Sequence, residues 1–157
     1  KYCMATIHAS TVRELILRLE NEPMNVPETL INLIDVLIVM RKNKADHHVL
    51  RVIEEVSETA GLEQKTVLVS PLWKFDFACQ RLNELSLTTV YRDRLAQAIG
   101  LNGKQILNEI TRRKEFLEEL KINQIRSIKQ VSEFCEVYIR DPKAAFLMVK
   151  KKSQPCS

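Results

Sequence analysis

The chain has 157 residues, of which 45% are hydrophobic and 28% are charged, so it has room for one globular domain or two small ones. This composition excludes a disordered tail, a collagen-like fibre and a disulfide-dense mini-protein, and no apolar run approaches the ~20 residues that a membrane-spanning helix needs. The net charge of +4 permits an anionic partner but does not demand one.

Glycine and cysteine usage narrows the possible chemistry. The three glycines, at positions 61, 100 and 103, cannot form either of the common glycine-rich phosphate-binding loops. The four cysteines stand far apart with no C-x-x-C pair, which favours reduced thiols over a zinc site or a disulfide framework. We therefore predict no metal site within this sequence.

The first residue is Lys1 rather than Met, and residues 2–9 already have the apolar pattern of folded structure. No charged-then-apolar signal sequence precedes them. We therefore expect the chain to be a piece of a longer polypeptide.

The first third of the sequence predicts a strand followed by two short helices. Residues 3–9 are apolar and predict a buried strand. Thr11 can cap a helix over residues 11–20, with Glu14 reaching back to complete a capping box. Pro27 is well suited to the first position of the second helix.

The middle of the sequence predicts antiparallel sheet. Residues 35–40, with an unbroken apolar run over residues 36–39, are typical of a strand buried on both faces, and β-branched residues alternate in residues 49–56 and 65–71. Residues 42–46 and Gly61 are the expected turns. A further short strand is expected where Trp73, Phe75 and Phe77 alternate with polar residues.

From position 87 the apolar spacing becomes helical, with a first helix ending at Gly100. Asn102 and Gln105 predict a capping box at the start of a second helix, residues 125–138 predict a third, and Pro142 begins a fourth. The expected domains are therefore a strand-rich part over residues 1–86, a helical part over residues 87–152, and a tail over residues 153–157.

His8 is the histidine that we single out as a candidate site residue. It ends the predicted strand just before a helix N-terminus, where free N–H groups favour an anion, so this position suits contact with a phosphate. The alternative is a strand-end histidine that bonds a neighbouring carbonyl, and the spacing alone favours that alternative.

Arg13 and Arg18 lie on the helix after His8. A guanidinium there can hold a phosphate, or a carboxylate of a neighbouring subunit, with two parallel hydrogen bonds. The interleaved acids Glu14, Glu20 and Glu22 support the other interpretation, an ordinary exposed helix face.

The two helices that meet at residues 99–101 have the spacing of a helix-turn-helix, which would make residues 103–114 a DNA-recognition helix. Arg112 and Arg113 fall at the end of that helix, and acids such as Glu109 and Glu115 would repel DNA. Nucleic acid is therefore not the expected partner. A free-standing module that binds DNA or protein through this helix pair remains the alternative function.

Several segments together resemble the C-terminal half of the motor ATPases of archaeal flagella (archaella), archaeal pili and type II or type IV secretion. Residues 6–10 (TIHAS) resemble that family's histidine box, and Arg18 with Leu19 matches its continuation. The remaining likeness lies in residues 24–27, 33–36, 51–56, 72–76, 112–117, 125–126 and 138–142.

The resemblance implies the C-terminal part of a RecA-like P-loop ATPase domain with mostly antiparallel strands, followed by a helical subdomain. It further implies a homo-hexamer that binds ATP and Mg²⁺ between subunits and engages a membrane platform protein at the cytoplasmic face of the membrane. In such enzymes the histidine-box residue, here His8, lies near the terminal phosphate, where positioned donors stabilise developing charge. Arg18 would serve that region or the subunit interface, and Arg13 and Arg51 are further nucleotide or interface candidates.

The family's phosphate loop and acidic magnesium-holding motifs belong before the histidine box, and this chain starts only a few residues ahead of it. We therefore expect the isolated chain not to hydrolyse ATP. Where related sequences carry consecutive arginines before the strand at Arg51, this chain has His47 and His48, so the role of Arg51 does not follow from the resemblance.

Overall fold

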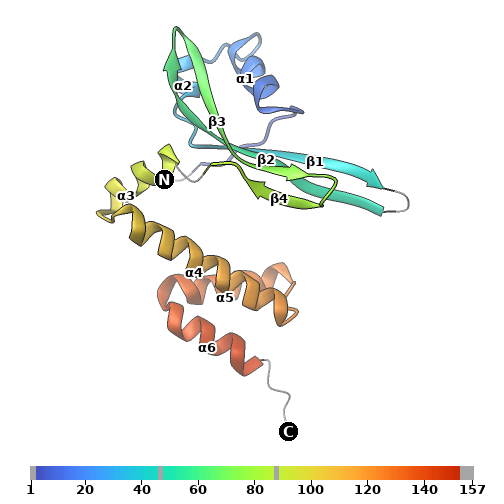
Figure 1. Ribbon diagram of the computed structural model, residues 1–157, viewed down its shortest axis with the longest axis vertical. Coiled ribbons are helices and arrows are strands. Elements are labelled where there is room, and N and C mark those ends of the chain that lie inside the picture. Colours follow the sequence, from blue (N-terminus) through green and yellow to red (C-terminus); the bar gives the residue numbers. More distant parts are fainter. Residues whose placement is uncertain (1–2, 46–47, 87–88, 153–157) are drawn as a thin grey trace. The chain divides into compact units, whose positions relative to one another are not determined.

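The computed structural model describes residues 3–45, 48–86 and 89–152 and divides the chain into two units, Lys1–Ile99 and Gly100–Ser157 (Figure 1). The first unit contains α1 (Val12–Glu20), α2 (Glu28–Ile31), β1 (Val36–Ala45), β2 (His48–Glu63), β3 (Thr66–Asp76), β4 (Arg81–Glu84) and α3 (Val90–Ile99). The second contains α4 (Gly103–Ile122), α5 (Ile128–Arg140) and α6 (Pro142–Lys152). The change from strands to helices near residue 86 thus precedes the division between the units, because α3 belongs to the first.

The sheet has four strands in the order β1-β2-β3-β4, and each neighbouring pair is antiparallel. The expectation of a RecA-like P-loop domain is therefore wrong, since the sheet of such a domain is mostly parallel. Short turns join antiparallel strands, whereas parallel strands need long crossover connections, and the described strands follow one another as hairpins. The predicted antiparallel strands of the middle region are present, but in a small meander.

Within the described residues, the first two hairpins do not turn where the sequence predicts, at residues 42–46 and at Gly61. Gly61 lies inside β2 at an irregularity in the pairing, and the β2–β3 turn falls at Gln64 and Lys65, both of which have positive φ. The turn expected at residues 42–46 is wrong for its described part, because β1 continues to Ala45, and Asp46 lies outside the described residues.

Trp73 and Phe75 extend β3 instead of forming a separate strand, and β4 follows as an edge strand that the sequence did not reveal. The turn into β4 is held by Asp76, whose carboxylate accepts hydrogen bonds from the backbone N–H groups of Ala78 and Cys79.

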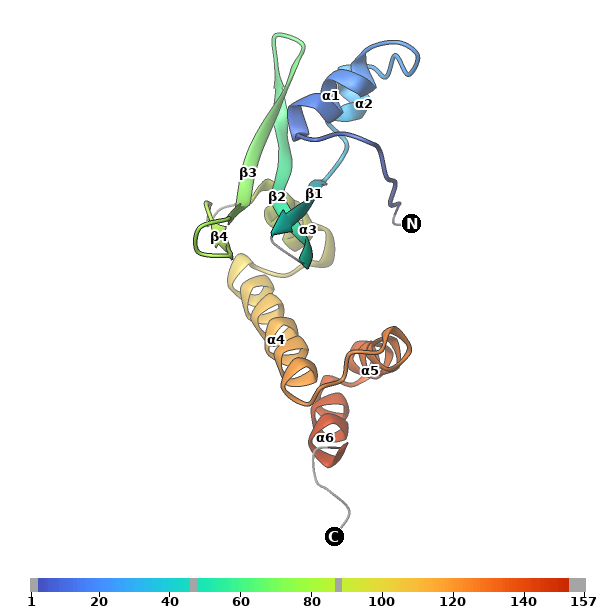
Figure 2. The same cartoon turned by 90° about the vertical axis from the view of Figure 1, so that its right-hand side faces the viewer.

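The core of the first unit lies between one face of the sheet and helices α1 and α2 (Figure 2). Leu37 and Val39 point into this core and are 4% and 7% exposed, whereas Ile38 between them is 53% exposed. β1 is therefore buried on one face only, and the expectation of burial on both faces is wrong. The core cluster consists of Val12, Ile16, Ile31, Leu37, Val39 and Val67.

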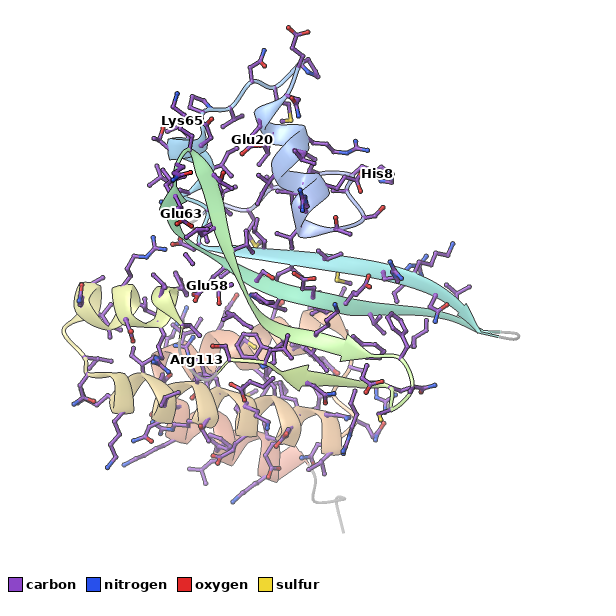
Figure 3. All side chains as sticks on the ribbon, turned by 45° about the horizontal axis from the view of Figure 1, so that its top comes forward. His8, Glu20, Glu58, Glu63, Lys65 and Arg113 are labelled. Carbon is purple, nitrogen blue, oxygen red and sulfur yellow. The ribbon has the colours of Figure 1, made fainter. Side chains whose placement is uncertain are left out.

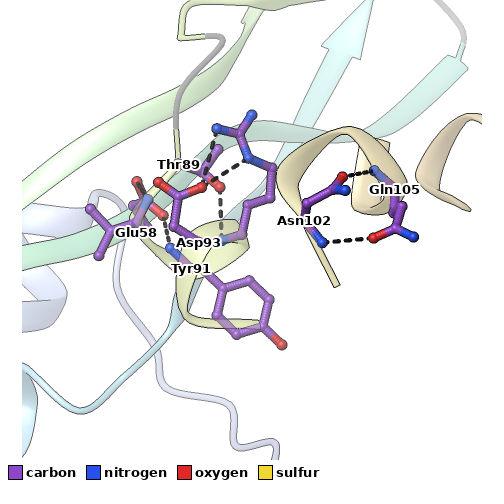
Figure 4. A network of polar contacts seen from close by, with 8 residues as sticks. Glu58, Thr89, Tyr91, Asp93, Asn102 and Gln105 are labelled. Carbon is purple, nitrogen blue, oxygen red and sulfur yellow. Dashed lines mark hydrogen bonds and ion pairs between the residues drawn. The ribbon is translucent and has the colours of Figure 1, made fainter. Parts of the chain in front are cut away.

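A buried carboxylate fastens α3 to the sheet. Glu58 in β2 is 1% exposed, and its two oxygens accept hydrogen bonds from the backbone N–H groups of Val90 and Tyr91, at 2.8 and 2.9 Å (Figure 4). These groups lack partners inside a helix, and the positive end of the helix dipole favours a carboxylate. Next to it, the hydroxyl of Thr59 donates to the carbonyl of Ile34 at 2.6 Å and ties the segment just before β1 to β2.

The second unit has a core built by α4, α5 and α6. Asn102 and Gln105 form the predicted capping box, in which each side chain accepts a hydrogen bond from the other residue's backbone N–H, at 2.9 and 2.8 Å (Figure 4). Asp141 caps α6 by accepting from two backbone N–H groups, so the predicted break before Pro142 is confirmed. The core residues are Phe116, Leu120, Ile125, Phe134, Tyr138, Ala145 and Val149.

Candidate functional site

His8 lies on an extended segment that leads into α1 (Figure 3). Residues 3–9 are not a strand, so this prediction is wrong: within the described residues, they form no backbone ladder with any strand. The imidazole of His8 is exposed, and it donates to or accepts from no described residue. An exposed imidazole in this position is able to contact an anion that approaches from outside the chain.

The first turn of α1 is held by its own side chains. Thr11 caps the helix as predicted, because its hydroxyl accepts a hydrogen bond from the backbone N–H of Glu14 at 3.1 Å. The Glu14 carboxylate does not reach back to Thr11 but accepts from the N–H of Ser10 at 2.7 Å. Thr11 therefore satisfies one N–H group of the first helical turn, and Glu14 bonds the residue before the cap.

Arg18 is paired within the same helix. Its Nη2 lies 2.8 Å from Oε1 of Glu14, which links Ser10, Glu14 and Arg18 into one network. The N–H of Ser10, together with the Arg18 guanidinium, holds the pKa of Glu14 below its ordinary value of 4.5. The ion pair is solvent-exposed, so it costs little to open when a stronger anion competes for Arg18.

Arg13 and Arg51 are exposed and lie on different elements, α1 and β2. No hydrogen bond or ion pair joins either of them to His8 among the described residues. The structure thus places His8, Arg13 and Arg18 on one continuous stretch of chain and puts Arg51 on the sheet, opposite Lys42 of β1.

The helix pair proposed for DNA binding consists of α3 and α4. On α4, Arg113 donates to Glu109 at 2.8 Å, and Lys114 lies 4.0 Å from Glu118, so these cations face acids of their own helix. Acidic partners lower the positive field that a phosphate backbone requires.

The structure also places residues whose roles the sequence did not reveal. Arg41 of β1 forms an ion pair with Glu54 of β2 at 2.6 Å, and its guanidinium lies 5.9 Å from the ring centre of Phe77. Glu58 was missed because a glutamate in a strand pattern is normally exposed, and its partners follow 32 and 33 positions later.

Metal-ligating side chains do not gather in the described part of the chain: no group of three or more His, Cys, Asp or Glu residues there could hold an ion. Three cysteines that the structure describes, Cys3, Cys79 and Cys135, are free thiols. Among the described helices, none has the length and apolar character needed to cross a bilayer.

No family model matches this chain. Three curated proteins of Methanocaldococcus jannaschii are similar to it, and each is named as uncharacterized. MJ0781 is 26% identical over 144 residues, which is 89% of this chain and 20% of that protein. MJ1287 is 25% identical over 143 residues (88% and 53%), and MJ0900 is 29% identical over 139 residues (83% and 24%). The chain therefore spans about half of MJ1287 and a quarter or less of the other two.

Proposed function

We propose that this chain is part of a motor ATPase of the archaeal secretion, pilus or archaellum class, and that it responds to nucleotide without hydrolysing it alone. In this account the phosphate loop and the magnesium-holding carboxylates come from other parts of a longer protein. The assembly would be a homo-hexamer that works at the cytoplasmic face of the membrane and engages a membrane platform protein.

The observation that carries this proposal is the short segment of chain that separates His8 from the core. The exposed imidazole lies four residues before Val12, the first residue of α1. The side chain of Val12 is 5% exposed and packs with Ile16 on the buried side of the helix. Thr11 and Glu14 fix the helix start between these two points. A phosphate that attracts His8 would therefore pull on the end of a packed helix, and a shift of α1 would reach β1 through Leu37.

The donors present suit a phosphate but not a metal ion. His8, Arg13 and Arg18 supply N–H groups that match phosphate oxygens. Glu14 is the carboxylate among them, and it is already engaged by Ser10 and Arg18. When bound, ATP would supply the transferable phosphoryl group and Mg²⁺ would neutralise its charge. This chain would hold or sense the terminal phosphate.

The extent of the similar proteins also supports a module within a longer chain. MJ0781 and MJ0900 each contain a region that matches most of this chain and are themselves about four to five times as long as that region, since it covers 20% and 24% of them. A segment reused in this way is consistent with a domain that works beside others.

A chimera tests the role of His8. The matching region of MJ0781 would be replaced by this chain, and steady-state ATP hydrolysis would be measured for the chimera and for its His8→Ala, Arg18→Ala and Lys129→Ala variants. We expect His8→Ala to lower kcat by about 10²–10³, the effect of losing one positioned donor, and Lys129→Ala to leave it unchanged. An unchanged kcat for His8→Ala, or ATP turnover by the isolated chain, would contradict the proposal.

A further inference from the structure

The sheet face opposite α1 and α2 holds α3 at one end, through Glu58, and farther along carries apolar side chains that the described structure leaves exposed. On β1, Ile38 is 53% exposed and Met40 is 62% exposed, whereas Leu37 and Val39 on the other face are buried. Side chains alternate along a strand, so Ile38 and Met40 point to the same side. This side is not the one that packs into the core of the first unit.

The strand pairing extends this surface across the sheet. Ile38 lies opposite Val56, Val56 lies opposite Trp73, and Met40 lies opposite Ile53, which is 36% exposed. Residues directly opposite each other in antiparallel strands share a face. We call the surface formed by Ile38, Met40, Ile53, Val56 and Trp73 the open face.

A pair of cations borders the open face. Lys42 follows Met40 by two positions on β1 and lies opposite Arg51 of β2, and both side chains are exposed. Like charges directly opposite each other destabilise a sheet. Neither cation forms an ion pair with another described residue, whereas the adjacent Arg41 is paired with Glu54. The chain thus keeps two unneutralised positive charges side by side.

The local pairing presents these residues on a two-stranded arm. The described pairing of β2 with β3 ends at Glu55 opposite Lys74, so residues 48–53 pair with β1 alone. The irregularity between Val39 and Met40 leaves Glu54 without an opposite residue, and Glu54 is the acid that pairs with Arg41. The bulge therefore places Glu54 where it neutralises Arg41, and Lys42 and Arg51 have no such acidic partner among the described residues.

We propose that the open face docks an acidic amphipathic helix of a partner protein. The apolar side of that helix would lie on Ile38, Met40 and Ile53, and its carboxylates would meet Lys42 and Arg51. Helices commonly dock their apolar side onto such surfaces, and interfaces combine an apolar centre with a charged rim. This inference does not depend on the proposed motor function.

The chemistry of the surface favours a protein over the other anionic partners. Nucleic acid is bound through rows of phosphate contacts, and the centre of the open face is apolar. Attachment to anionic lipid through charge typically uses clusters of about 4–8 Lys or Arg residues, and the open face has two at its border. Two cations beside three exposed apolar side chains match a helix with an apolar side flanked by carboxylates.

The position of Trp73 provides a local readout, because it is the chain's one tryptophan and belongs to the open face. A synthetic helical peptide with leucine on one side and glutamate on the other would be titrated against the full chain while Trp73 fluorescence is recorded. We expect a saturable change, with the affinity lowered about tenfold or more in the Lys42→Glu/Arg51→Glu variant. The Lys104→Glu/Lys129→Glu variant makes the same change of net charge on α4 and α5 and should bind within about twofold of the parent.

Met40→Ser supplies a second variant, because an exposed side chain can be changed with little effect on folding. It should weaken peptide binding while the far-ultraviolet circular dichroism stays the same. The proposal is overturned if the acidic peptide does not bind, if Met40→Ser and the charge-reversed variant both bind normally, or if a peptide with lysine in place of glutamate binds equally well. Tighter binding of phosphatidylglycerol vesicles or duplex DNA, with the same sensitivity to Lys42→Glu/Arg51→Glu, would also overturn it and assign the surface to lipid or nucleic acid.

Discussion

The carboxylate of Glu58 accepts a hydrogen bond at 2.9 Å from the backbone N–H of Tyr91, which lies 33 positions later in the sequence. Its other oxygen accepts from the N–H of Val90, so one buried side chain holds the first turn of α3. This contact explains why α3 belongs to the same unit as the sheet although it follows the last strand.

Replacing Glu58 should destabilise the first unit. Glu58→Gln keeps the shape but turns an amide NH₂ toward a backbone N–H, which leaves buried donors without acceptors and should cost about 1–3 kcal/mol of unfolding free energy. Glu58→Ala should cost more, because it also leaves a cavity. Urea unfolding of the two variants measures this loss. Glu63→Gln, an exposed change on the same strand, is the matched control, and equal stability of Glu58→Gln and Glu63→Gln would disprove the role.

Acid should loosen the start of α1. The native pKa of Glu14 is lowered by the Ser10 N–H and by Arg18, so the native state releases the proton more readily than the unfolded chain. This contribution to stability is present above the ordinary value of 4.5 and is lost as the pH falls through the lower native pKa. A carboxyl-carbon NMR titration should give Glu14 a midpoint below 4.5, and Arg18→Ala should raise that midpoint toward the ordinary value. A midpoint at or above 4.5 in the parent chain would refute the network.

Tyr138 should make the second unit sensitive to alkali. Burial, with a smaller effect of Glu109, raises the pKa of the phenol above its ordinary value of 10.0, and the hydroxyl has no hydrogen-bond partner among the described residues. The native state therefore holds this proton more tightly, and the contribution is present below pH 10.0 and lost as the pH rises through the higher native pKa.

Tyr138→Phe should remove that alkaline loss. The change deletes an unsatisfied hydroxyl and keeps the ring that packs 4.7 Å from Phe116, so the unfolding free energy near neutral pH should stay within about 1 kcal/mol of the parent or rise. Urea unfolding of both proteins would be compared at about pH 9 and about pH 11. The lysines titrate in both proteins, so a difference in how the unfolding free energy changes with pH comes from the phenol. An identical fall in stability for both proteins would show that Tyr138 does not cause it.

The helices of the second half of the chain were predictable because residues close together in the sequence determine where they begin and end. The Asn102–Gln105 capping box and the Asp141–Pro142 break each involve residues only a few positions apart. The Thr11 cap of α1 is equally local, although the Glu14 carboxylate accepts from the N–H of Ser10 and not from that of Thr11.

The sheet was less predictable because hydrophobic patterns do not specify strand partners or direction. Residues 3–9 have the composition of a strand but pair with no described strand, and the RecA-like expectation failed on the direction of pairing. Gly61 signalled a turn, yet Gln64 and Lys65 take the left-handed conformations of the hairpin. The contacts of Glu58 and the open face depend on long-range register, which one sequence does not reveal.

Measuring ATP hydrolysis by purified full-length MJ0781 tests whether a region like this chain works within a motor ATPase. It would be measured beside a deletion variant that lacks the 144-residue region similar to this chain. We expect the intact protein to hydrolyse ATP in the presence of Mg²⁺ and the deletion to lower kcat by about 10² or more, the effect of losing a positioned phosphate donor. Absence of ATP turnover by the intact protein, or full turnover by the deletion variant, would contradict it.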